Sequence, residues 1–172
     1  MTAIDKNKIH PYTLSILLLG LFPGGFSLFY FINRSIISLE IILGSIFLLG
    51  SLSIVLHFII FKKGERYLGE VIFYSLGGWG IILTTFLMAI NFYFHHIPIV
   101  KEYAIINREA EGTNQFSIPY YGSINNEKYR GYSYLLNFEE DEITNISNNT
   151  RARITEATGC LGFDIILNKE LH

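Results

Sequence analysis

Cysteine is almost absent from the sequence, because Cys160 is the single one among 172 residues. A lone cysteine excludes a disulfide within the chain and any metal site built from several thiolates. No stretch is rich in lysine or arginine, and the formal net charge is -2. The sequence therefore lacks the basic surface by which proteins bind nucleic acid, and we expect no nucleic-acid partner.

Recognisable catalytic motifs are also missing. The sequence has no phosphate-binding glycine-rich loop, dinucleotide-binding fingerprint, nucleophile elbow, zincin motif or pair of catalytic acids. It gives no candidate catalytic residue, no cofactor and no set of metal ligands. An enzyme is therefore not the favoured interpretation.

Charge is scarce in the first half of the chain and ordinary in the second. Residues 12–94 carry 7 charged side chains in 83 positions, whereas residues 95–172 carry 18 in 78. A soluble domain has about 25% charged residues, so the first part is not typical of a water-soluble fold. The contrast predicts an N-terminal segment (1–11), a membrane domain (12–94) and an extramembrane β domain (95–172).

Three apolar runs lie in the first part, at residues 12–32, 36–61 and 71–94. Each has at least the roughly 20 residues that a helix needs to cross the hydrocarbon core of a bilayer. We therefore predict three transmembrane helices of a multi-pass protein, with the two termini on opposite sides. Residues 33–35 alone separate the first two runs, which favours a tight antiparallel helical hairpin.

Lysines and arginines near the ends of the predicted helices indicate the orientation. Five lie on the side of the N-terminus and the second connection, namely Lys6, Lys8, Lys62, Lys63 and Arg66. Three lie on the other side, namely Arg34, Lys101 and Arg108. The excess predicts a cytoplasmic N-terminus and an extracytoplasmic C-terminal domain at the cell membrane.

Pro23, Gly24 and Gly25 interrupt the middle of the first apolar run. Proline removes a backbone hydrogen bond and frees a carbonyl that protein or water must satisfy within lipid. One interpretation is a broken helix that lines a substrate or ion path, as in many transporters. The favoured interpretation is a kink packed against a neighbouring helix, because glycine lets two backbones approach closely.

Glu40 and Asn91 are polar residues within the second and third runs. A carboxylate at the bilayer centre costs about 2.5–3.5 kcal/mol, but Glu40 lies within about one turn of the predicted interface. Helical spacing places Glu40 on one face with Gly44, Phe47 and Ser51. This face predicts a packing seam, and Asn91 predicts a hydrogen bond to a neighbouring helix. We therefore expect a homo-oligomer or a membrane-protein partner.

His95 and His96 directly follow the third run. Histidine is a common metal ligand, but neighbouring side chains on a helix point about 100° apart and need a third ligand. We therefore interpret the pair as residues of the membrane interface that bind no metal.

From residue 99 onward the apolar residues alternate with polar ones, which predicts β-strands. The five expected strands cover residues 101–108, 115–121, 129–138, 150–157 and 163–171. In the third, the alternation places Tyr132, Tyr134, Leu136 and Phe138 on one face. A glycine-rich connection at residues 159–162 joins the last two strands. The predicted fold class is a membrane protein of α+β type, with three transmembrane helices and a small antiparallel sheet or barrel-like domain.

These features favour a membrane-anchored interaction or accessory module in a larger assembly. The helices would fix a β domain that binds a partner through a strand edge or its aromatic face. The alternative is a transport or channel subunit that uses the Pro23 break and Glu40. A third hypothesis is a membrane enzyme with a site formed by His95, His96 and carboxylates of the C-terminal domain.

Overall fold

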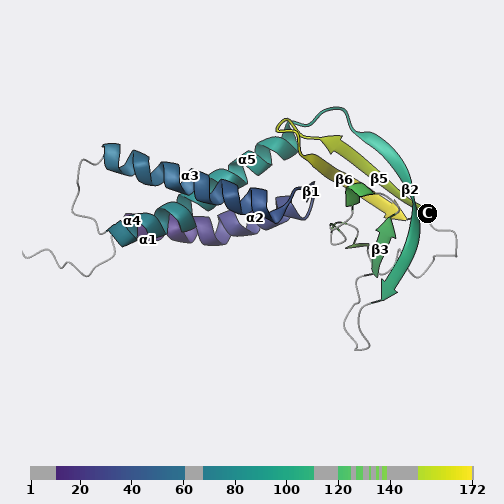
Figure 1. The fold of residues 1–172 in the computed structure, drawn as a ribbon, viewed down its shortest axis with the longest axis horizontal. Helices are drawn as coiled ribbons and strands as arrows, with labels where there is room; N and C mark the ends of the chain where they lie inside the picture. Colours follow the sequence, from purple (N-terminus) through teal and green to yellow (C-terminus); the bar gives the residue numbers. More distant parts are fainter. Residues whose placement is uncertain are drawn as a thin grey trace, which may run out of the picture. The chain divides into compact units, whose positions relative to one another are not determined.

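The computed structural model describes residues 11–60, 68–110, 120–124, 127–129, 132, 135, 137–138 and 151–171, and these form two compact units (Figure 1). The first unit contains the described residues up to Phe31 together with Ser38–Ala89. The second contains Ile32–Ile37 and the described residues from Ile90 onward. The basic residues on the predicted cytoplasmic side lie outside the described residues, so the orientation stays a prediction: Lys6, Lys8, Lys62, Lys63 and Arg66.

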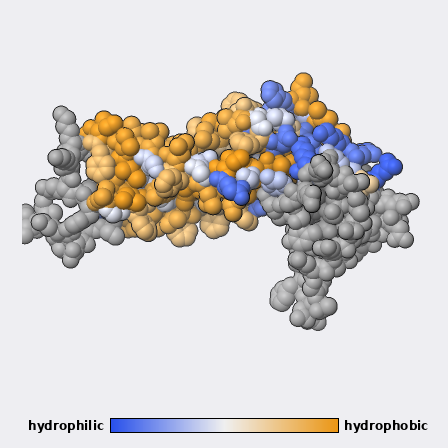
Figure 2. All heavy atoms as spheres, viewed as in Figure 1, coloured by the Kyte–Doolittle hydropathy of each residue, from blue (hydrophilic) through white to orange (hydrophobic). Residues whose placement is uncertain are grey.

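Three apolar helical segments are long enough to cross a membrane. Their surfaces are largely apolar, as Figure 2 shows, with side chains such as Phe26, Leu48 and Phe86 more than half exposed. Two of the segments contain a π-helical stretch. In chain order the elements are α1 (Pro11–Leu19), η1 (Gly20–Gly24) and α2 (Gly25–Ile32), then α3 (Leu39–Ile60), and finally α4 (Leu68–Tyr74), η2 (Ser75–Gly80) and α5 (Ile81–Tyr93).

Glycines allow η2 to pack closely against both η1 and α3. A Cβ added to Gly20 would lie 2.5 Å from the Cα of Gly78, and one added to Gly80 would lie 2.6 Å from the carbonyl oxygen of Ile46. Real Cβ atoms essentially never lie this close to an atom of another residue. The third helical segment therefore fits against the other two because these positions have no side chain.

An open antiparallel sheet makes up most of the second unit, with strand order β1-β6-β5-β2-β3-β4. The α+β class is therefore confirmed, and the sheet is open rather than closed into a barrel. The strands are β1 (Ser35–Ile36), β2 (Ile99–Ala110), β3 (Tyr120–Ile124), β4 (Asn137–Phe138), β5 (Arg151–Thr158) and β6 (Asp164–Leu171).

The connection between the first two helices forms strand β1. Ser35 pairs with Ile165 and Ile36 pairs with Asp164, and the backbone N–H of Ile166 donates to the carbonyl of Arg34 at 2.8 Å. The helix α3 therefore begins at Leu39, later than the apolar run predicts. Strand β1 covers part of the free edge of β6, which would otherwise expose unpaired backbone groups.

The β5–β6 hairpin is confirmed at its predicted place. Gly162 has φ 86°, in the left-handed region that favours glycine, and its N–H donates to Gly159 at 2.9 Å. Farther along, Thr155 pairs with Asn168 whereas Glu156 pairs with Ile166. Residue 167 is thus an extra residue on β6, a β-bulge that breaks the alternation predicted for residues 163–171 and brings Ile166 into the core.

The prediction of a strand at residues 129–138 is wrong for most of the residues that the structure describes in this range. Tyr129 ends a 3₁₀-helix, η3 (Glu127–Tyr129), and the N–H of Tyr132 donates back to Tyr129 at 2.9 Å. The N–H of Leu135 donates to the carbonyl of Tyr132 at 3.0 Å, and among the described residues of this range only Asn137–Phe138 form a strand. The predicted strand 115–121 lies mostly outside the described residues.

The core of the second unit lies on one face of the sheet, here called the inner face. Paired residues of antiparallel strands share a face. Tyr103 pairs with Ala152, and Lys101 with Ile154. Buried side chains pack together on this face: Tyr129, Leu135, Ala152, Ile154 and Ile166.

Gly20→Ala is expected to destabilise the helical unit by about 1–3 kcal/mol, because the added methyl group meets backbone atoms of Gly78 that cannot move aside. Gly69→Ala is the matched control, since nothing lies within 4 Å of a Cβ there. That change should not destabilise the protein, because alanine is more favourable than glycine in a helix by up to about 1 kcal/mol. Denaturant unfolding in detergent micelles, followed by the fluorescence of Trp79, measures both. Equal unfolding of the two variants would contradict the close packing.

Candidate functional site

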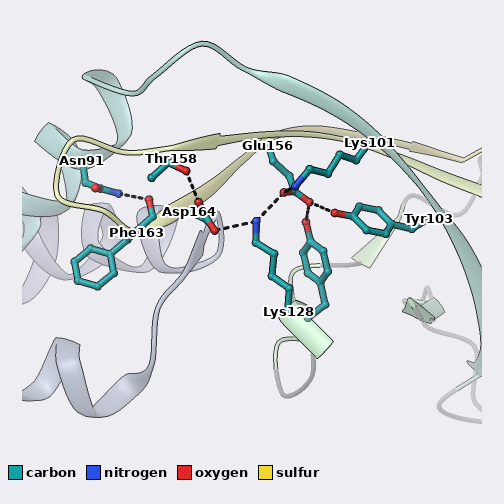
Figure 3. A network of polar contacts seen from close by, with 9 residues as sticks. Asn91, Lys101, Tyr103, Lys128, Glu156, Thr158, Phe163 and Asp164 are labelled. Atoms are coloured by element: carbon teal, nitrogen blue, oxygen red, sulfur yellow. Dashed lines mark hydrogen bonds and ion pairs between the residues drawn. The ribbon is translucent and has the colours of Figure 1, made fainter. Parts of the chain in front are cut away.

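The carboxylate of Glu156 is the centre of a buried polar cluster on the inner face of the sheet (Figure 3). Its Oε2 atom accepts hydrogen bonds from the Nζ atoms of Lys101 at 3.0 Å and Lys128 at 2.7 Å. Its Oε1 atom accepts from the hydroxyl of Tyr103 at 2.6 Å and from that of Tyr129. Only 3% of Glu156 is exposed to solvent. We call these five residues the Glu156 cluster.

Three separate elements supply the cluster. Strand β2 places Lys101 and Tyr103 two positions apart, so both side chains lie on the inner face beside β5. The short helix η3 contributes the neighbours Lys128 and Tyr129. Glu156 therefore joins β2, β5 and η3 through one carboxylate.

The partners of Glu156 keep it ionised despite its burial. Burial alone raises the pKa of the Glu156 carboxyl, but the hydrogen bonds from Lys128, Tyr103, Tyr129 and Lys101 outweigh it and bring the pKa to about 2. Burial and the hydrogen bond to Glu156 both raise the pKa of Tyr129, so its hydroxyl stays protonated and remains a donor.

Asp164 extends the network towards the β5–β6 hairpin. Its Oδ2 atom lies 2.9 Å from Nζ of Lys128, and its Oδ1 atom accepts a hydrogen bond from Thr158 at 2.6 Å. Burial raises the pKa of Asp164, but these two partners lower it by more. Burial lowers the pKa of Lys128, and its bonds to Glu156 and Asp164 raise it by more. Lys101 and Lys128 thus balance the charges of two carboxylates.

Because its charges are balanced, the Glu156 cluster holds segments of the chain together and is not a reactive centre. Both oxygens of Glu156 already accept two hydrogen bonds each, so the carboxylate has little capacity to take a proton from a substrate. The same bonds hold η3 over the inner face. Sequence reasoning missed the cluster because Glu156 is separated from its partners by 27 to 55 positions.

Asn91 binds the β5–β6 hairpin instead of a neighbouring helix, which was the expected partner. Its Nδ2 atom donates to the carbonyl of Phe163 at 3.1 Å, and its Oδ1 atom accepts from the N–H of Leu161 at 3.0 Å. The residue is fully buried. A side chain at Gly159 would collide with that of Asn91, so the hairpin needs glycine there.

His95 and His96 also contact the hairpin through backbone groups. His95 forms an isolated bridge with Gly159, and the N–H of His96 donates to Thr158 at 2.9 Å. The ring Nδ1–H of His95 donates to the carbonyl of Phe92 at 2.8 Å. The pair therefore lies where the chain passes from α5 to the sheet.

Pro23 and Gly24 lie in η1 and Gly25 directly follows it; Pro23 is exposed, whereas Gly24 packs against the third helical segment. The carbonyl of Gly24 accepts a hydrogen bond from the Thr85 hydroxyl at 3.0 Å, and a Cβ on Gly24 would lie 3.4 Å from a methyl of Ile81. The N–H of Gly25 closes onto the carbonyl of Gly20. The π-helical stretch that contains Pro23 thus packs against the third helical segment through Gly24, whose carbonyl is bound by Thr85.

Glu40 lies in the first turn of α3 and is exposed. Gly44, one turn further along, has no atom within 4 Å of a Cβ position, and Phe47 is 66% exposed. The predicted seam therefore faces away from the other two helical segments of the unit.

A second polar group lies within the helical unit, where His57 and Tyr74 are both buried. The Tyr74 hydroxyl lies 2.6 Å from Nδ1 of His57, and the hydroxyls of Ser53 and Ser75 are 3.4 Å apart. The sequence signal for this contact is a histidine within an apolar run, but its partner is 17 positions away.

In the part of the chain that the structure describes, no three His, Cys, Asp or Glu side chains come together to hold a metal ion. Comparison of the chain with protein-family models, curated proteins and solved structures finds no match.

Glu156→Gln is expected to destabilise the second unit by about 3–5 kcal/mol, because it leaves two ammonium groups around a neutral amide. Amide hydrogen exchange from β2 and β5 should become at least about a hundredfold faster. Glu102→Gln is the matched control. Glu102 is 46% exposed and pairs with Arg153 at 3.2 Å, so its change should cost at most about 1 kcal/mol. Unchanged amide hydrogen exchange in Glu156→Gln would show that the cluster does not hold these segments together.

Acid should weaken the second unit through the same carboxyl. Its pKa is about 2 in the folded protein against 4.5 for an ordinary glutamate, so the stabilisation is complete above 4.5 and is lost as the pH falls from 4.5 towards 2. The full loss is about 3 kcal/mol at about 1.4 kcal/mol per pKa unit. Denaturant unfolding across this range measures it. Glu156→Gln should show a much smaller slope, with Asp164 still contributing in the same direction. An equal slope in both proteins would contradict this assignment.

Proposed function

We propose that the three apolar helices cross the cell membrane and that the protein is a membrane-anchored interaction module in a larger assembly. The observation that supports this is the composition of the second unit. It combines the C-terminal sheet with the connection between the first two helices and with the end of α5. Strand β1 and the bonds of Asn91 join these parts.

Such a unit is suited to presenting a surface at the membrane. A domain on a long tether would sample many positions, and a partner would have to restrict them on binding. Here residues at two helix ends, Ile32 and 90–93, are themselves parts of the β unit, so no long tether separates it from the helices. A partner that binds the sheet is thereby kept next to the bilayer.

The outer face of the sheet is the proposed binding surface. The inner face is occupied, because Tyr103 and Tyr129 bind Glu156 and η3 covers it. On the outer face Glu102 lies 3.7 Å from Arg151 and 3.2 Å from Arg153, and all three are at least 45% exposed. Exposed ion pairs contribute about 0–1 kcal/mol, so a partner's carboxylates can take over the two arginines at little cost. We therefore propose a protein partner with an acidic contact patch.

The exposed seam of α3 offers a contact within the membrane. Glu40 and Gly44 lie on it, and glycine permits close approach of a further helix. A second copy of the chain or a membrane-protein partner would cover this face.

The alternative function, a transport or channel subunit, has less support from the geometry. A path through the Pro23 break would use carbonyls that face water. The carbonyl of Gly24 is instead bound by Thr85, and Gly20 packs against Gly78.

Purification of the full chain from its native membranes in mild detergent tests the proposal. The wild type and the double variant Pro23→Ala with Glu40→Gln should recover the same partner protein. The outer-face variant Arg151→Glu with Arg153→Glu should recover at least about tenfold less of it. Unchanged hydrogen exchange in β2 and β5 checks that this variant is folded, since both arginines are exposed.

Two results would contradict the proposal. One is a monomer of 19.7 kDa that brings no partner in any preparation. The other is a normally inserted Pro23→Ala or Glu40→Gln protein that fails to complement a strain lacking the gene, while the outer-face variant complements it. That second pattern would favour the transport alternative.

A further inference from the structure

Apolar side chains are exposed around the end of α5 in the second unit. Phe94 is 70% exposed and Ile97 is 86% exposed, and both belong to the chain that leaves the helix. Leu161, at the tip of the β5–β6 hairpin, is 45% exposed. We call Tyr93, Phe94, Ile97 and Leu161 the apolar rim.

Hydrogen bonds hold the hairpin tip against residues 90 and 91 in the last turn of α5. The N–H of Leu161 binds the side chain of Asn91 at 3.0 Å, and the thiol of Cys160 lies 3.6 Å from the carbonyl of Ile90. Since α5 ends at Tyr93, Asn91 lies about 3 Å before the helix end along its axis. The tip of the hairpin therefore lies beside residues that still belong to the helix.

Charge is missing from both parts of this region. Residues 93–100 and 159–163 contain no Asp, Glu, Lys or Arg, although the C-terminal part of the chain carries 18 such residues in 78 positions. The nearest carboxylate along the hairpin, Asp164, is bound by Thr158 and Lys128. The region thus combines an apolar tip with aromatic residues at a helix end, as segments at a membrane interface do.

We infer that the apolar rim lies in the boundary between lipid headgroups and acyl chains, so that the β5–β6 hairpin is a second attachment of the β unit to the bilayer. This inference rests on the proposed crossing of the membrane by α5, but it needs no protein partner. The rim contacts lipid, because it is continuous with the end of a helix that is proposed to face lipid. The rim also has no charged side chain with which a protein partner could form an ion pair.

A nitroxide spin label on Cys160 tests this directly, because Cys160 is exposed and is the single cysteine of the sequence. The full chain is reconstituted in vesicles of phosphatidylcholine and phosphatidylglycerol. Collision rates are measured with oxygen, which concentrates in lipid, and with a water-soluble nickel chelate. The ratio of oxygen to nickel rates at Cys160 should be at least about threefold higher than at a label on the outer face of the sheet.

Two control proteins carry Cys160→Ser and a new cysteine. Arg153→Cys labels the outer face, where the side chain of Arg153 is 45% exposed, and should report water. Leu48→Cys labels the lipid-facing side of α3, where Leu48 is 69% exposed, and should report lipid. Adding Leu161→Glu to the protein labelled at Cys160 should lower its ratio to that of Arg153→Cys.

The outcomes separate this inference from the proposed function. A water-like ratio at Cys160 together with a lipid-like ratio at Leu48→Cys would overturn the inference and leave the membrane anchor intact. Low rates with both reagents at Cys160 would also overturn it and would indicate a protein contact with a second copy of the chain. A water-like ratio at Leu48→Cys would overturn both proposals.

Discussion

A carboxylate can be buried in a protein only if other groups compensate its charge, and Glu156 imposes this condition on the whole second unit. Its four donors come from β2 and η3, so the strand and the short helix must both be in place for the buried carboxylate of β5 to be compensated. The apolar core beside it includes Ile154 and Ile166, which are buried on the same face. The polar cluster determines which segment covers the inner face, and the apolar core supplies much of the burial.

A different kind of bond joins the chain segments within this unit. Asn91 satisfies two backbone groups of the β5–β6 hairpin, and β1 adds two residues to the edge of β6. Both contacts use backbone hydrogen-bonding groups that would need another partner if they were left buried. Their value therefore lies in specifying where the chain segments meet, and Gly159 is required because Asn91 fills the space beside it.

The sequence predicts well the parts of the fold that depend on neighbouring residues. Apolar runs of about 20 residues indicate the helices, and the glycines at 159–162 indicate the hairpin. Strand β1 could not be predicted, because two residues of a loop gain strand geometry only from pairing with Ile165 and Asp164. The alternating aromatics from Tyr132 to Phe138 suggested a strand. Alternation contains no information on the long-range hydrogen bond of Tyr129 to Glu156 or on the local hydrogen bond that turns the chain at Leu135. The burial of Glu156 could not be predicted either, because in the sequence it looks like any other charged residue of a solvent-exposed strand face.

The polar cluster and the apolar rim are linked through Asp164. This carboxylate follows the hairpin tip by three positions, and an unpaired charge there would draw the tip towards water. Lys128 lies 2.9 Å from Asp164 and 2.7 Å from Glu156, so one ammonium group serves both carboxylates. Thr158 binds the other oxygen of Asp164 from across the hairpin. The charge nearest the tip is thus compensated within the sheet, which leaves Leu161 free to contact an apolar medium while the inner face keeps its balanced charges.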